Sequence, residues 1–142
     1  MLNGIRRWLA RLRGEDAADQ DGAVYVIGLL PNDSDAEIAL NNLAEADFAA
    51  RQISVLTTDP LRTAALTDTP GSWGQQTPDA AVERMRSLGV AEADRAAFRS
   101  GLDGGGVLIV IRTRRDTAAA AEEMLRDQQA SLVRSVDERR TG

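Results

Sequence analysis

The chain lacks the side chains that most catalytic and metal sites use. Its 142 residues include no cysteine and no histidine, and all 17 basic residues are arginine, so lysine is absent too. Disulfides, Cys or His metal sites, cysteine nucleophiles, Ser–His pairs and Schiff-base lysines are therefore excluded. Carboxylates, hydroxyls, one tyrosine and arginine remain, which disfavours an enzyme without excluding a hydrolase that uses carboxylates alone. We predict a protein that is not an enzyme and that needs no metal and no cofactor.

Two patterns superficially resemble ligand sites. The triplet 104–106 is all glycine, but it precedes an apolar run, whereas a phosphate loop lies after a strand and before a helix. It is better interpreted as a turn that needs positive φ or close backbone approach. Asp33, Asp35 and Glu37 resemble calcium ligands, but Ile38 stands where a calcium loop needs glycine. These acids fit a helix N-terminus, where the helix dipole favours negative charge.

A small-ligand or anion-binding regulatory site is the alternative functional hypothesis. Asn32 and Ser34 lie at a predicted helix start, whose backbone amides can hold an anion or a polar ligand. Arg112, after the second apolar run, would add positive charge. Arg112, Arg114 and Arg115 together are more typical of a solvated charge patch. The expected ion partners of that patch are Asp103, Asp116 and Glu122.

The first fourteen residues form a separate basic segment. They hold four arginines and no acid, so the remainder has 22 acids against 13 arginines, a net charge of −9. Apolar residues at helical spacing predict a short amphipathic helix over 2–13. The predicted partner-binding residues are Ile5, Arg6, Trp8, Leu9 and Leu12 in this segment, together with Trp73. Three binding surfaces are possible for this helix: this protein's own domain, another protein, or an anionic membrane.

Trp73 lies in a loop, 58–77, that is rich in Thr, Asp, Gly and Pro. It either fills a gap at the surface or contacts a partner. The chain has no apolar run long enough to span a membrane and no secretory signal pattern. We therefore expect a cytoplasmic protein, with peripheral membrane attachment as an alternative. Its acidic body is expected to repel nucleic acid.

Two dense apolar runs, 23–30 and 107–111, predict strands that are buried on both faces. Two alternating runs predict half-exposed edge strands over 52–57 and 131–136. The predicted helices are 35–47, 79–88, 92–101 and a fourth that ends near 129, with a helical turn at 61–66. Ser34 is the predicted N-cap of the first helix and Glu37 completes a capping box. Thr113 or Asp116 is the predicted cap of the last helix, and Gly89 is the predicted stop of the second.

The order of these elements predicts an α+β fold of the ferredoxin-like type, βαβ-(αα)-βαβ, with a four-stranded sheet, a helical-hairpin insertion and the N-terminal amphipathic helix. A doubly wound α/β sheet is the alternative. The predicted organisation is a helix over 1–14, a linker over 15–22, the domain over 23–136 and a tail over 137–142. Two main helices cover one sheet face. The hairpin 79–101 is the favoured cover of the other, and the N-terminal helix or a second copy, giving a homodimer, remains an alternative.

These segments resemble the YflT-type general stress protein domain of bacteria over residues 23–136. The most specific part is Leu88-Gly89-Val90, a short helix with Ala97-Phe98, and the glycine triplet followed by its apolar strand. The basic N-terminal helix lies outside the shared pattern, and the loop 58–77 stands where many relatives have a long segment rich in glycine and alanine. The resemblance implies a cytoplasmic stress-response module that acts through protein–protein interaction and has no established catalytic activity.

Overall fold

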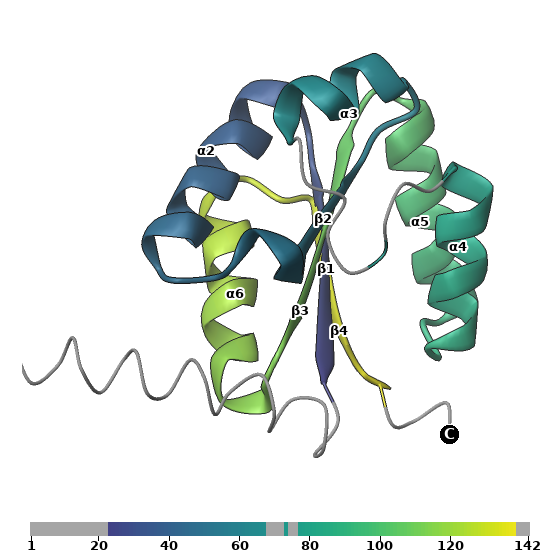
Figure 1. Ribbon diagram of the computed structural model, residues 1–142. Helices are drawn as coiled ribbons and strands as arrows, with labels where there is room; N and C mark the ends of the chain where they lie inside the picture. Colours follow the sequence, from purple (N-terminus) through teal and green to yellow (C-terminus); the bar gives the residue numbers. More distant parts are fainter. Residues whose placement is uncertain (1–22, 68–72, 74–76, 139–142) are drawn as a thin grey trace, which may run out of the picture.

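The computed structural model describes residues 23–67, 73 and 77–138. A four-stranded antiparallel sheet lies between two helical layers, which confirms the predicted α+β class (Figure 1). The elements are β1 (Val24–Leu30), α2 (Asp33–Glu45), η1 (Ala50–Gln52), β2 (Ile53–Leu56), α3 (Pro60–Leu66), α4 (Pro78–Ser87), α5 (Glu92–Asp103), β3 (Val107–Thr113), α6 (Arg115–Asp127) and β4 (Leu132–Asp137). The predicted N-terminal helix lies outside the described residues.

The two dense apolar runs are neighbours in the middle of the sheet. The strand order is β2-β3-β1-β4, and β1 pairs with β3 over its whole length, from Val24 opposite Thr113 to Leu30 opposite Val107. All seven residues of β1 are buried. The pairing confirms the predicted central strands, and because every pair is antiparallel the doubly wound alternative is wrong.

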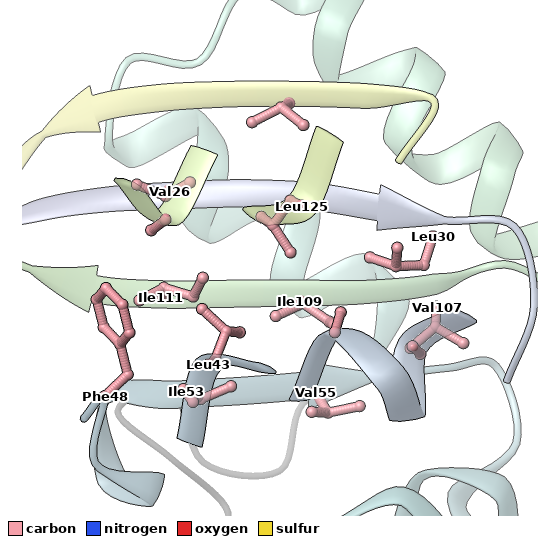
Figure 2. Packing of buried hydrophobic residues seen from close by; sticks show 14 of the residues in the cluster. Val26, Leu30, Leu43, Phe48, Ile53, Val55, Val107, Ile109, Ile111 and Leu125 are labelled. Carbon is pink, nitrogen blue, oxygen red and sulfur yellow. The ribbon is translucent and has the colours of Figure 1, made fainter. Parts of the chain in front are cut away.

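The first hydrophobic cluster fills the space between the sheet and the layer of α2 and α6. Figure 2 shows side chains of both central strands meeting side chains from this layer. Its fully buried large members are Val26, Leu30, Leu43, Val107, Ile109, Ile111 and Leu125. Successive side chains of a strand point to opposite faces of the sheet. The residues next to these in β1 and β3 therefore point to the other face.

The second cluster lies on the other face, beneath the hairpin of α4 and α5. Its fully buried large members are Ile27, Met85, Phe98, Leu102 and Leu108. The hairpin is therefore a cover of the second sheet face, as predicted. Among the described residues the large exposed apolar side chains are Ile38 and Leu61, both on helices. The sheet consequently presents no open apolar face that a second copy would have to cover.

The start of α2 differs from the prediction. Asn32 is the N-cap, and its side-chain oxygen accepts a hydrogen bond of 2.8 Å from the backbone N–H of Asp35. The helix therefore begins at Asp33, and the predicted cap at Ser34 is wrong. The asparagine oxygen reaches the third helical amide as a serine hydroxyl would, so the cap forms two residues earlier. Ile38 lies on the outer side of this helix and is 46% exposed.

The predicted half-exposed character of the edge strands is wrong for β2, because all four of its residues are buried. The hydroxyl of Ser54 is sheltered by the chain at Trp73, whose backbone N–H donates to it at 2.9 Å. In β4, Val133 packs in the first cluster and Val136 in the second. Three residues apart in a strand means opposite faces.

Helix ends give two further outcomes. α4 begins after its N-cap Thr77, and Gly89, with φ +89°, follows its end, which confirms the predicted start and stop. The N-cap of α6 is Arg114, with no side-chain capping bond, so the predicted caps are wrong. Thr113 is the last residue of β3 instead, and its hydroxyl bonds that of Thr117 at 2.6 Å.

Candidate functional site

A group of polar and aromatic side chains lies where β1 begins and where β3 and β4 end. We call Tyr25, Trp73, Arg84, Arg112 and Glu138 the Tyr25 cluster. Register places Tyr25 opposite Arg112 on β3, and Glu138 follows β4. The Tyr25 hydroxyl donates to Glu138 Oε1 at 2.8 Å, and Arg112 donates from Nη2 to Glu138 Oε2 at 3.3 Å. One carboxylate thus joins three strands at one end of the sheet.

Trp73 completes the cluster from the hairpin side. Its side chain is 5% exposed, and its ring centroid lies 6.0 Å from that of Tyr25 at an interplanar angle of 53°. The guanidinium carbon of Arg84, on α4, lies 5.4 Å from the Trp73 ring centroid, within cation–π range. Trp73 therefore fills a gap in the second cluster. It cannot meet a partner, as the partner-binding hypothesis requires, without leaving this core.

The protonation of the Tyr25 cluster follows from its contacts. Burial raises the pKa of Tyr25, and the hydrogen bond and charge of Glu138 raise it further. Burial alone would raise the pKa of Glu138, but the hydrogen bonds from Arg112 and Tyr25, with the Arg112 charge, outweigh it and lower that pKa. The phenol is thus a neutral donor to an ionised carboxylate. Chemically, this arrangement holds the end of β4 against β1 and β3.

Replacing Glu138 by glutamine is expected to lower the free energy of unfolding by about 1 kcal/mol at neutral pH, since a charge-assisted bond is lost at a partly exposed site. The folded-state pKa of Glu138 lies below its ordinary 4.5. Its contribution is therefore present above the unfolded-state pKa and is lost as pH falls through the folded-state value. Urea denaturation across this range measures it. Glu92→Gln, on the exposed surface of α5, is the control, and a Glu138→Gln deficit that persists in acid would contradict the assignment.

The structure separates the residues of the predicted small-ligand site. Asn32 and Ser34 lie beyond the end of β1, whereas Arg112 lies opposite Tyr25 near its beginning. The five residue steps from Tyr25 to Leu30 span roughly 17 Å of strand. A single small ligand therefore cannot contact all three predicted residues, and the alternative site is not assembled.

A different arginine lies at the start of α2. Arg62, on α3, forms an ion pair with Asp33 and donates from Nη2 to the carbonyl of Gly105 at 2.9 Å. The hydrogen bond from Arg62 lowers the pKa of Asp33. This contact ties α3 to the start of α2 and to the turn before β3. Sequence reasoning missed it because its three members lie far apart in the chain.

The predicted arginine patch after β3 is an ion-paired surface. Arg112 pairs with Glu138, Arg114 with Asp116 and Arg115 with Asp137. Asp116 is thus confirmed as a partner, whereas Asp103 pairs with Arg99 and Glu122 with Arg126 within their own helices. In both cases the arginine and the acid are four residues apart in one helix, a spacing that places their side chains next to each other. The partners from 137–138 also show that the folded chain extends past the predicted domain end at 136.

No group of three or more acidic side chains converges as a metal site within 23–67, 73 and 77–138. The helices in this part of the chain are all too short or too polar to cross a bilayer. Comparisons with known protein families, with curated proteins and with solved structures find no match.

Proposed function

We propose that this protein is a non-enzymatic interaction module of the bacterial general-stress type, with a ferredoxin-like domain that its N-terminal segment attaches to another surface. The order β2-β3-β1-β4, with β1 and β3 central and a helical hairpin between β2 and β3, supports the ferredoxin-like assignment. The absence of Cys, His and Lys supports a role without covalent chemistry.

The observation that carries the attachment proposal is the completeness of the core. α2 and α6 cover one face of the sheet and α4 and α5 cover the other. The apolar stripe of residues 2–12 therefore has no place to fill between sheet and helices. A stripe of that kind is unfavourable in water, since each large side chain gains roughly 1.5–3 kcal/mol when it is fully buried. We therefore expect another surface to bury this apolar stripe.

The charges of the segment select the kind of surface. Its four arginines carry no compensating acid within residues 1–14, and each contributes about 1 kcal/mol near an anionic lipid surface. Trp8, on the apolar stripe, suits the boundary between headgroups and acyl chains. An anionic membrane and an acidic protein partner both satisfy this chemistry.

Co-sedimentation with vesicles tests the proposal. The full chain is expected to sediment with vesicles of phosphatidylglycerol and phosphatidylcholine. With vesicles of pure phosphatidylcholine it should stay in the supernatant. A truncation to 15–142, and the full chain with Arg6, Arg7, Arg11 and Arg13 replaced by glutamine, should lose this binding. Arg86→Gln, which removes an exposed charge from α4, is the control and should bind as the wild type does.

Two results would distinguish the protein's own core, a membrane and an acidic protein as the surface that the segment contacts. Loss of several kcal/mol of stability in the 15–142 truncation would place the segment in the core and overturn the attachment role. A stable truncation combined with no vesicle binding by the full chain would reject the membrane and leave an acidic protein as the attachment surface.

A further inference from the structure

The two helical layers differ in how their charges are compensated. On α2 and α6, four exposed acids have no ion partner among the described residues: Glu37, Glu45, Glu123 and Asp127. On the hairpin, Asp79, Glu83, Asp94 and Asp103 are each paired with an arginine. The hairpin has one such acid, Glu92, which is exposed and has no ion partner among the described residues. The α2–α6 layer thus presents the larger uncompensated negative charge.

The same layer exposes a large apolar side chain. Ile38, 46% exposed, lies on the outer side of α2, and Glu45 is seven residues further on, which is two helical turns along the same side. α2 and α6 are joined by a hydrogen bond of 3.2 Å from Gln128 to Asp35. The outer face of α2 therefore combines an apolar contact point with negative charge on both helices, and within the described chain nothing covers it.

We propose that residues 2–12 dock, in the same molecule, on this outer face of α2 and α6. The segment offers Ile5, Trp8 and Leu9 for contact with Ile38. The four arginines within residues 1–14 equal the four uncompensated acids in number and carry the opposite charge. The hairpin layer is the worse receptor, because four of its five acids already have arginine partners.

The chain is long enough for this docking. Ala23, where the described chain begins, accepts a hydrogen bond from Glu138 at the end of the sheet where β1 starts. α2 ends and α6 begins at this same end. Residues 15–22 can span roughly 26–29 Å when extended, whereas the thirteen residues of α2 are only about 20 Å long. The extended linker is thus longer than the helix that carries Ile38.

This docking rests on the proposed attachment function and regulates it. The segment cannot use one apolar stripe for Ile38 and for a second surface at the same time. An anionic surface must therefore compete with the acidic face of α2, and the apparent affinity falls by the fraction of molecules in which the segment is docked. High salt weakens both states, because both rest on exposed charges.

Acrylamide quenching of Trp8 in the full-length protein tests the docking. Trp8→Phe supplies the Trp73 background, and acrylamide is neutral, so changes of charge do not alter its access. Glu37→Arg with Glu45→Arg should weaken docking by roughly fivefold to tenfold, the effect of reversing two exposed charges, and should raise Trp8 quenching. Ile38→Gln, which keeps all charges, should raise it too. Glu92→Arg, an exposed reversal on α5, is the matched control and should leave it unchanged.

Each outcome decides the proposal. Trp8 quenching that the α2 substitutions leave unchanged, or that Glu92→Arg raises equally, overturns it. Protection of Trp8 that disappears on dilution, with a matching change in sedimentation, assigns the face to the segment of a second copy and overturns the intramolecular form. Vesicle binding is a separate measurement. Failure of both the wild type and the α2 double variant to bind anionic vesicles rejects membrane attachment, whereas tighter binding by the double variant than by the wild type supports docking as its regulator.

Discussion

Replacing Phe98 by alanine is expected to lower the free energy of unfolding by about 3–5 kcal/mol, which is the usual cost of emptying a buried phenylalanine site. The Phe98 side chain is fully buried in the second cluster, where α5 meets the sheet. The cluster is built from the sheet and from both helices of the hairpin, so the cavity cannot close by a local shift. Urea denaturation monitored by circular dichroism measures the change. Leu61→Ala, at an exposed position of α3, should stay within about 0.5 kcal/mol of the wild type.

The Phe98 experiment also tests whether the hairpin belongs to one cooperative core. Leu125→Ala, in the first cluster, should cost about 2–5 kcal/mol and shift the same single transition. Two separate transitions, with Phe98→Ala moving only the weaker one, would show that the hairpin unfolds independently of the sheet. In that case the second face would need another cover, and a homodimer would again be a serious alternative.

The central architecture could be predicted because its evidence is local. Each of the runs 23–30 and 107–111 is apolar on both faces, and such a run has few stable positions other than the middle of a covered sheet. The first helix of the hairpin could be predicted too, because Thr77 and Gly89 are residue types that are typical of a helix start and a helix stop. Burial on both faces then required a second helical layer.

The details that failed depend on distant contacts. The burial of Ser54 requires the backbone of Trp73, nineteen residues away. The bond between Tyr25 and Glu138 joins residues 113 apart, and nothing near either residue indicates the other. The predicted grouping of Asn32 with Arg112 was wrong for a related reason. Because β1 and β3 are antiparallel, the end of β1 and the end of β3 lie at opposite ends of the sheet. Composition identifies the available chemistry, whereas topology decides which groups meet.

The glycine triplet 104–106 offers a graded test of the turn before β3. Gly106→Ala is expected to lower the free energy of unfolding by about 1–3 kcal/mol or more, because overpacking here is against atoms that cannot rotate away. An added Cβ would lie 2.9 Å from the carbonyl oxygen of Gly101 and 3.0 Å from that of Leu30. Both are backbone atoms of elements that the core holds in place. Chevron analysis or urea denaturation would report the loss.

The two neighbouring glycines supply matched controls with different causes. Gly105 has φ +97° and open space around its Cβ position, so Gly105→Ala should cost about 1 kcal/mol from backbone strain alone. Gly104 has ordinary φ, and its added Cβ would meet backbone oxygens only at 3.5 and 3.6 Å, so Gly104→Ala should be near neutral. The expected order of cost is Gly106, Gly105, Gly104. A Gly105→Ala cost above that of Gly106→Ala would mean that the turn's handedness, rather than the close packing of α5, β1 and β3, limits this corner of the fold.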